Sequence, residues 1–332
     1  MNDLPAIARS LVVEGKGILA ADESIHTADQ RLMHYGIDAT LETRRKYRDL
    51  FLSAPGMESY LSGVILFAET FIERDGQGSP FPSALSVRGV HPGIKVDEGT
   101  EPFPESPDES ITKGLLGLSE RLAEFKKGGA VFTKWRAVIR IDGDKLPTAA
   151  ARVENAKRLA AYAKEAQMAG LVPILEPEVL LEGTHARSRA KAVLEETLGT
   201  LFTVLREQTV DPESMLLKTS MALSGSESGK KDMPEEVAED TVAALMASVP
   251  SAVAGIVFLS GGQTPEQATD NLRAIAKKAK AANAPWPLTF SFARALQDEA
   301  LSAWGGRAEY VEAARTTFLH RLKAVSEASQ GK

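Results

Sequence analysis

Short, continuous apolar runs recur along the chain, each bounded by glycine or by polar residues. We interpret them as β-strands, because strands that are covered on both faces lack the polar alternation of a half-exposed strand. Their starts lie roughly 30–45 residues apart, which leaves room for one helix and its loops in each interval. The predicted strands are Gly17–Ala21, Gly63–Phe67, Gly93–Val96, Ala130–Trp135, Leu171–Leu175, Met215–Leu217, Gly255–Leu259 and Pro287–Phe290.

The intervals between these runs carry amphipathic patterns. Apolar residues recur there every three or four positions, as on the buried face of a helix. One helix has a clear start, with Thr264 as a candidate N-cap and Pro265 at its first position. The apolar stripes comprise Leu115, Leu118, Leu122 and Phe125; Val153, Ala156, Ala160 and Ala163; and Ala268, Leu272, Ile275 and Ala279.

Strand and helix alternate throughout, and no break in composition marks a second domain. The pattern predicts an α/β fold, a single-domain (β/α)8 TIM barrel over residues 1–332, with a doubly wound open sheet as the alternative. Three stretches are predicted to be irregular: Glu73–Arg88, the acidic and proline-rich Glu98–Glu109, and Ser224–Asp232.

Composition narrows the functional classes. Of the 332 residues, 43% are hydrophobic and 25% are charged, which is typical of a globular protein. The net charge of −6 provides no global field to attract nucleic acid or an anionic membrane, so neither is expected as a partner. The sequence has no cysteine, no apolar run long enough to span a bilayer and no secretory signal pattern at its start. We therefore expect a cytoplasmic protein.

Charged and polar residues gather where the predicted strands end. In a barrel these ends meet at one face, which is where such folds place their chemistry. Lys134 and Arg136 are two positions apart and so point to the same side of a strand, and Glu176 and Glu178 share that spacing. The other groups at predicted strand ends are Asp22-Glu23-Ser24, Lys95, Lys218, Ser260-Gly261-Gly262 and Arg294.

Lys218 is the most unusual of these residues, because it directly follows the apolar run Met215–Leu217. An ammonium in such a place is poorly solvated, which favours a neutral, nucleophilic amine. Neighbouring cations are expected to lower the pKa of lysines in this cluster, while the carboxylates carry protons. These are the components of amine catalysis on a carbonyl. The alternative is structural: Lys218 extends to water, and Lys134 pairs with Glu176 to close the barrel.

Two anion sites are predicted around this lysine. The segment Ser260-Gly261-Gly262 precedes a predicted helix, so its backbone N–H groups can converge on a phosphate, and Arg294 offers bidentate contact nearby. The opposite site would use residues far round the ring: Ser24, Thr27 and Lys95. Two phosphate sites that flank a reactive lysine indicate a bisphosphorylated sugar as substrate.

Metal-assisted chemistry is disfavoured, and no metal or cofactor is expected. The five histidines are scattered without paired ligand spacing, and there is no cysteine. No glycine-rich nucleotide-binding motif is present. Glu23, Glu69 and Asp97 are interpreted as structural or rim residues.

The chain also carries, in order from Gly15, the motifs GKGILAADES, GVILFAET, GIKVDEG, KWRAV, PILEPEVL, LLKTSM, FLSGGQT, LTFSFARALQ and AWGG. Together they resemble the class I, Schiff-base fructose-bisphosphate aldolases over nearly the whole chain. The resemblance implies reversible cleavage of fructose 1,6-bisphosphate to dihydroxyacetone phosphate and glyceraldehyde 3-phosphate, in glycolysis and gluconeogenesis, without a metal. It also implies a homo-oligomer, because members of the family are commonly tetramers.

The resemblance assigns a role to each motif residue. Lys218 would form the Schiff base, Glu176 would shuttle protons with support from Glu178, Asp22 would act on the C4 hydroxyl, and Lys134 would maintain the charge balance. The C1 phosphate would be held by Ser260, Gly261, Gly262 and Arg294. The opposite phosphate would be held by Ser24, Thr27, Arg31, Lys95 and Arg136.

Some residues depart from the family pattern: Ser214 and Thr219 beside the lysine strand, and Phe292 and Ala293 before the arginine. Family members often continue into a tail that ends in tyrosine, whereas this sequence stops at Lys332. We expect the tail's part in proton transfer to be absent or filled by another group such as Glu176. Two alternatives stay open: a preference for another sugar such as sedoheptulose 1,7-bisphosphate, and a scaffold role beside catalysis.

Overall fold

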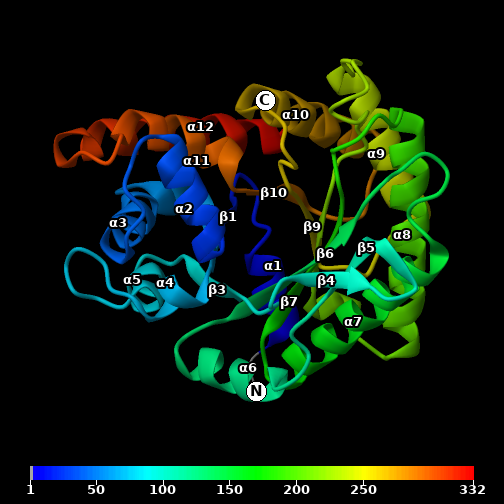
Figure 1. The fold of residues 1–332 in the computed structure, drawn as a ribbon, viewed down its shortest axis with the longest axis horizontal. Coiled ribbons are helices and arrows are strands. Elements are labelled where there is room, and N and C mark those ends of the chain that lie inside the picture. The colour runs from blue at the N-terminus through cyan, green and yellow to red at the C-terminus, as the bar shows by residue number, and fades with distance from the viewer. Residues whose placement is uncertain (1–2) are drawn as a thin grey trace.

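The predicted strands close into a parallel barrel in the computed structural model, which describes residues 3–332 (Figure 1). Around the ring the strands follow the order β1-β10-β9-β8-β7-β6-β3-β2. The predicted fold class is therefore confirmed, although residues 1 and 2 of the predicted domain lie outside the described residues. The barrel strands are β1 (Gly17–Ala21), β2 (Leu61–Leu66), β3 (His91–Lys95), β6 (Phe132–Ile139), β7 (Val172–Val179), β8 (Leu216–Thr219), β9 (Gly255–Phe258) and β10 (Leu288–Phe292).

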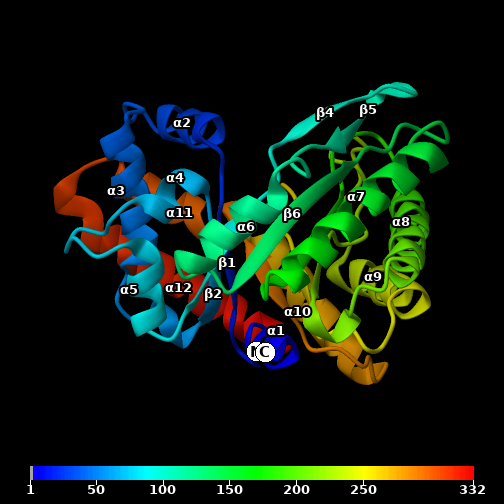
Figure 2. The ribbon, with the colours of Figure 1, turned by 90° about the horizontal axis from the view of Figure 1, so that it is seen from below.

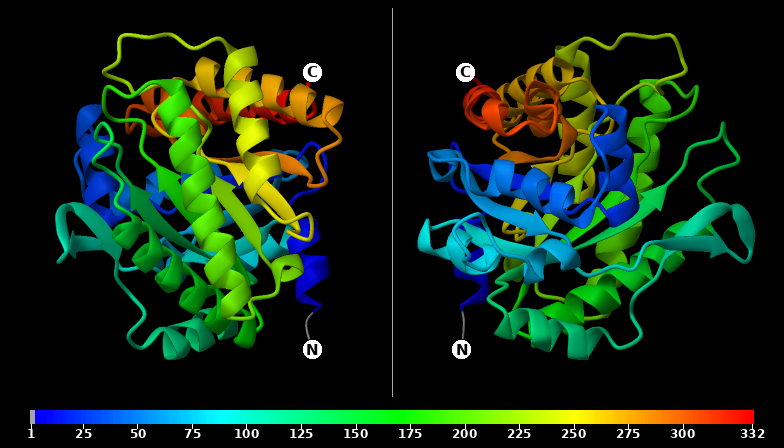
Figure 3. Two further views of the ribbon diagram at one scale, coloured as in Figure 1. Left: turned by 90° about the vertical axis from the view of Figure 1, so that its right-hand side faces the viewer. Right: turned by 60° about the vertical axis from the view of Figure 1, so that its left-hand side comes forward.

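Helices surround the barrel, as two further views show (Figure 3). Thr264 caps α10 as predicted, because its side chain accepts the backbone N–H of Gln267 at 3.2 Å. Among residues 3–332, every helix is too short or too polar to cross a membrane. The α-helices are α1 (Leu4–Ser10), α2 (Ile25–His34), α3 (Leu41–Leu52), α4 (Ala68–Ile72), α5 (Phe81–Val87), α6 (Leu118–Lys127), α7 (Ala149–Met168), α8 (Arg187–Glu207), α9 (Pro234–Ser248), α10 (Pro265–Ala281), α11 (Arg294–Trp304) and α12 (Val311–Ser329). Short 3-10 turns are η1 (Met57–Ser59), η2 (Pro212–Ser214) and η3 (Ala308–Tyr310).

Alternating strand residues build two separate apolar cores. Ile18 and Ala20 of β1 join an inner cluster that also contains Phe132 of β6, Ile174 of β7 and Leu216 of β8. Residues of the opposite parity on the same strands pack between the barrel and its helices. Since side chains alternate along a strand, the inward series continues upward into the charged positions of β1, β6, β7 and β8.

Helix α1 covers the N-terminal end of the barrel. Its Ala8, together with Leu11 and Val12 just beyond its end, belongs to the inner cluster. Gly255 at the start of β9 lies so close that an added Cβ would be 2.7 Å from Val12. The barrel interior is thus filled by apolar side chains below the charged residues, and the opening lies at the C-terminal end of the strands.

Two of the stretches predicted to be irregular contain regular structure. Within Glu98–Glu109, β4 (Thr100–Phe103) pairs antiparallel with β5 (Ser106–Thr112), and this hairpin extends away from the barrel (Figure 2). The sequence pattern did not reveal this hairpin, because its buried apolar cluster is small and consists of Phe103, Ile111 and Ala151. Within Glu73–Arg88, α5 buries Phe81 and Leu85. The third stretch, Ser224–Asp232, is irregular as predicted.

Four barrel strands run further than their apolar runs predicted: β8 and β10 by two residues, and β6 and β7 by four. Strand β6 continues to Ile139 and β7 to Val179, and their ladder pairs Arg136 with Glu176 and Val138 with Glu178. The apolar pattern ends earlier because the inward positions of these strands become charged near the opening. On α6 the error is the reverse, since Leu115 of the predicted stripe precedes the first helical residue, Leu118.

Gly93 on β3 tests the packing of the barrel interior. An added Cβ would lie 2.2 Å from the Phe132 ring, so Gly93→Ala is expected to lower the free energy of unfolding by roughly 1–3 kcal/mol. The matched control is Gly199→Ala on α8, where no atom lies within 4 Å and a helical alanine is expected to add about 1 kcal/mol. Urea unfolding of both variants measures the difference, and equal or greater stability of Gly93→Ala would contradict this account.

Candidate active site

A cavity of about 360 Å³ opens at the C-terminal end of the barrel, above the apolar interior. It collects side chains from seven of the barrel strands or the loops that follow them, so the ring of strand ends predicted from the sequence is present. The predicted residues that line it are Asp22, Ser24, Thr27, Lys95, Lys134, Arg136, Glu176, Glu178, Lys218, Ser260, Gly261 and Arg294. Of the predicted set, Arg31 and Gly262 lie beside this cavity and outside its lining.

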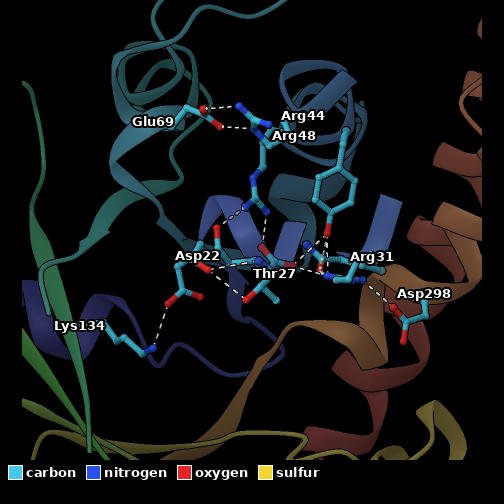
Figure 4. Close-up of polar contacts among 12 residues, drawn as sticks. Asp22, Thr27, Arg31, Arg44, Arg48, Glu69, Lys134 and Asp298 are labelled. Atoms are coloured by element: carbon cyan, nitrogen blue, oxygen red, sulfur yellow. Dashed lines mark hydrogen bonds and ion pairs between the residues drawn. The ribbon is translucent and has the colours of Figure 1, made fainter. Parts of the chain in front are cut away.

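A chain of four charged groups crosses the base of the cavity. Glu176 Oε1 lies 2.8 Å from Lys218 Nζ, and Glu176 Oε2 lies 2.5 Å from Lys134 Nζ. Lys134 Nζ also donates to Asp22 Oδ2 at 2.9 Å, a contact visible in Figure 4. The side chains of Lys218 and Glu176 are each only 4% exposed. Glu176 therefore joins the two lysines, and Lys134 joins the two carboxylates.

The pKa values of this chain are controlled by burial and by opposite charge. Burial raises the pKa of Glu176, but attraction to Lys134 and Lys218 outweighs it, so the pKa lies below its usual value. The same balance holds the pKa of Asp22 well below its usual range. For Lys134, burial lowers the pKa, whereas Asp22 and Glu176 raise it above the usual range. The expectation that cationic neighbours lower lysine pKa values is therefore wrong for Lys134, because two carboxylates contact it directly.

A second set of ion pairs forms one wall of the cavity. Lys95 Nζ lies 2.5 Å from Asp97 Oδ1, and it also donates to the Asp97 carbonyl at 2.7 Å. The other carboxylate oxygen of Asp97 accepts the backbone N–H of Arg136 at 3.2 Å. The Arg136 guanidinium in turn pairs with Glu178. Asp97, interpreted from the sequence as a structural or rim residue, is buried, lines the cavity and holds Lys95.

The glycine-rich loop after β9 forms the opposite end. Gly261 and Gly262 have φ values of +55° and +86°, a left-handed backbone that glycine adopts without strain. Arg294 lies close over this loop, since a Cβ on Gly262 would be 3.6 Å from Arg294 Nη2. Ser260 is buried and lines the cavity. A loop with a guanidinium beside it is suited to bind an anion.

Ser291 on β10 is a site residue that sequence reasoning missed. It is 1% exposed and lines the cavity, and its hydroxyl has no hydrogen-bond partner within residues 3–332. A buried polar atom at a cavity wall without a protein partner is free to bind a ligand. The prediction placed the end of this strand at Phe290. Alternation from Thr289 through Ser291 to Ala293, which also lines the cavity, was the available signal.

The start of α2 lies on the far side of the cavity from β8. Ser24 caps this helix by accepting the backbone N–H of Thr27 at 3.3 Å. Arg31, one turn beyond Thr27, pairs with Glu23 and lines an adjoining cavity of about 380 Å³. The two cavities share Thr27 and Arg294 in their walls. Arg31 therefore lies next to the predicted phosphate side with part of its charge already neutralised.

Three of the residues that depart from the family pattern lie outside the cavity lining. Ser214 is buried before β8, Thr219 is buried on the outer side of that strand, and Phe292 belongs to the outer core. Only Ala293 contributes to the cavity wall. The environment of Lys218 is therefore defined mainly by its inward neighbours.

A closed parallel barrel with a buried lysine against a carboxylate, and with cationic groups at both ends of its cavity, defines an enzyme equipped for amine catalysis on an anionic carbonyl compound. Residues 3–332 match the family model described as glycolytic, fructose-bisphosphate aldolase class-I. The chain belongs to the class-I fructose-bisphosphate aldolase family.

Individual relatives agree with this assignment. The chain is 45% identical over 331 residues to fructose-bisphosphate aldolase 2 of Caenorhabditis elegans, covering 100% of this chain and 90% of that protein. It is 44% identical to human fructose-bisphosphate aldolase B, covering 99% and 90%. The structure superposes with a TM-score of 0.96 on fructose-bisphosphate aldolase from Plasmodium falciparum in complex with TRAP and a small-molecule inhibitor, at 42% identity over 99% of this chain and 94% of that one. The predicted family and enzyme class, a metal-independent lyase, are confirmed.

Replacing Lys134 tests the electrostatics of the cavity base. Lys134→Met removes the attraction that lowers the pKa values of Asp22 and Glu176, so both pKa values rise and both groups become protonated at higher pH. The acid limb of the pH profile of kcat/KM is expected to move upward by roughly 1–3 pH units. Lys126→Met, on α6 outside the cavity, is the control and is expected to keep the original profile. An unshifted limb in Lys134→Met would show that Lys134 does not control these carboxylates.

Proposed function

We propose that Lys218 is the nucleophile with which this class-I fructose-bisphosphate aldolase cleaves fructose 1,6-bisphosphate. The observation that carries the proposal is the burial of Lys218 in direct contact with a single carboxylate, Glu176, at 2.8 Å. The amine attacks the C2 carbonyl, and the carbonyl oxygen becomes a hydroxyl and then leaves as water. Glu176 is placed to take protons from the nitrogen and to supply them to the departing oxygen.

The bond-breaking step uses the other end of the ion chain. Asp22 removes the proton of the C4 hydroxyl, the C3–C4 bond breaks, and its electron pair enters the iminium at C2 to give an enamine. Glyceraldehyde 3-phosphate leaves. Protonation of C3, for which Glu176 is the nearest proton carrier to Lys218, and hydrolysis by one water then release dihydroxyacetone phosphate. Lys134 contacts both Asp22 and Glu176, which supports its role in keeping their charges balanced.

The two ends of the cavity support the two phosphate sites. The loop Ser260-Gly261-Gly262 with Arg294 would hold the C1 phosphate, and Ser291 would donate its free hydroxyl to the bound substrate. The opposite phosphate would lie against the groups on the other wall: Ser24, Thr27, Lys95 and Arg136, with Arg31 behind them. Glu178 would support this wall by pairing with Arg136. No feature of residues 3–332 favours another sugar or a scaffold role.

Three further expectations remain proposals. Residues 1–332 would form one domain, the protein would act in the cytoplasm, and the chain would assemble as a homo-oligomer, with a tetramer implied by the family resemblance.

Reductive trapping tests the nucleophile. Borohydride added with dihydroxyacetone phosphate is expected to leave a covalent adduct on Lys218, which peptide mass spectrometry can locate. Lys218→Met is the control and is expected to form no adduct and to lose cleavage activity by at least about 1,000-fold. Activity of the unmodified enzyme is expected to survive EDTA. An adduct on another lysine, or none at all, would overturn the proposal.

Arg294 tests the C1 phosphate site. Arg294→Ala removes a charge-assisted contact worth about 1.5–3 kcal/mol, so the KM for fructose 1,6-bisphosphate is expected to rise roughly 10- to 100-fold while kcat changes less. Arg140→Ala, which replaces an exposed arginine outside the cavity, should leave both constants near their original values. Steady-state kinetics measure both, and an unchanged KM in Arg294→Ala would exclude this contact.

A further inference from the structure

Glu23 holds a buried carboxylate that the proposed reaction does not use. It directly follows Asp22, and its side chain is 8% exposed. One carboxylate oxygen pairs with Arg31 and accepts a hydrogen bond from the hydroxyl of Tyr47 at 3.0 Å, while the other pairs with Arg48. Attraction to Arg48 and Arg31 outweighs the effect of burial and lowers the pKa of Glu23, so the carboxylate stays ionised.

The same arginine holds the backbone of this residue. Arg48 Nη2 donates to the Glu23 carbonyl at 2.8 Å, while its Nη1 contacts the Glu23 carboxylate. Strand β1 ends at Ala21, so the sheet ladder no longer constrains the chain at Asp22. Arg48 is only 3% exposed. Its guanidinium therefore constrains the backbone at Glu23, two residues beyond the end of the strand.

The network also reaches the neighbouring unit of the barrel, because β10, which precedes α11, pairs with β1. Arg31 donates to Gln297 at 2.8 Å and pairs with Asp298 at 2.6 Å, and both acceptors lie on α11. Arg294 is the first residue of that helix, so these contacts fall one turn beyond it. Glu23, through Arg31, therefore ties the β1–α2 corner to the helix that presents Arg294.

Asp22 itself has few constraints on its direction. Among residues 3–332 its carboxylate makes a single ion pair, to Lys134 at 2.9 Å, and this partner comes from β6. The side-chain direction therefore depends on how firmly the peptide between residues 22 and 23 is held. A displacement of about 1 Å at a reacting group can cost about 100-fold in rate.

We propose that Glu23 is a positioning residue for carbon–carbon bond cleavage, acting through Asp22 by fixing the β1–α2 corner with Arg48 and Arg31. The proposal rests on the proposed function, in which Asp22 takes the C4 proton. A positioning role for Glu23 would affect two stages of the reaction differently. Schiff-base formation on Lys218 does not need Asp22 in place, whereas cleavage does.

Glu23→Gln tests this separation, because it keeps the shape of the side chain and removes its charge. Borohydride trapping of dihydroxyacetone phosphate on Lys218 is expected to stay within about threefold of the unmodified enzyme. The kcat for cleavage of fructose 1,6-bisphosphate is expected to fall about 100-fold, with little change in KM. Unchanged cleavage, or an equal fall in trapping and cleavage, would overturn the proposal. Failure of the unmodified enzyme to trap would instead overturn the role of Lys218.

A pair of variants on α3 decides the matter if Glu23→Gln does not fold. Arg48→Lys keeps the positive charge but loses the fork, and it is expected to lower cleavage at least tenfold with trapping preserved. Arg44→Lys is the matched control one turn away, since Arg44 is also paired, with Glu69 at 2.8 Å and Asp29 at 2.9 Å, but does not contact Glu23. Arg44→Lys should retain cleavage. Equal losses in both variants, with circular dichroism confirming folded protein, would show that helix packing alone matters.

Discussion

The ion chain Lys218, Glu176, Lys134 and Asp22 is the interaction on which the rest of the site depends. Removing a charge from water inside a protein costs several kcal/mol unless a partner and hydrogen bonds compensate for it. Here each charged group contacts the next at 2.5–2.9 Å across three strands and the end of a fourth. This ion chain keeps both carboxylates ionised and places the amine of Lys218 beside the carboxylate of Glu176. The proposed proton transfers and the charge balance around Lys218 both depend on this geometry.

The barrel provides that geometry through strand parity and closure. Inward positions of β1, β6, β7 and β8 are apolar near the N-terminal end and charged near the opening. The apolar layer, with α1 beneath it, keeps water from the lower side of the ion chain. The charged residues therefore face a cavity that is open on one side only. In the ladder between β6 and β7, Arg136 lies in register with Glu176. This register fixes the positions of the two strands relative to each other.

Side-chain contacts also constrain the segments around the ion chain that lie beyond the ends of the strands. The corner after β1 is held by the Glu23 network, and the end of β3 is held by Asp97. Each of these devices acts on backbone just beyond the last ladder hydrogen bond. Charged side chains thus constrain the backbone outside the sheet, as the ladder hydrogen bonds do within it.

The sequence by itself determined the alternation of strand and helix, the ring of polar strand ends and the identity of the residues around Lys218, because periodicity and residue type are local properties. It did not determine the β4–β5 hairpin, whose apolar contact is too small to leave a pattern, or the true ends of β6 and β7, where charges replace apolar residues on the inward face. Only the tertiary structure decided that Lys134 is held charged by two carboxylates, that Asp97 and Ser291 line the cavity, and that Arg31 lies beside it, paired with Glu23. The physical reason is that ion pairing and desolvation depend on distances of a few ångströms between strands far apart in the chain.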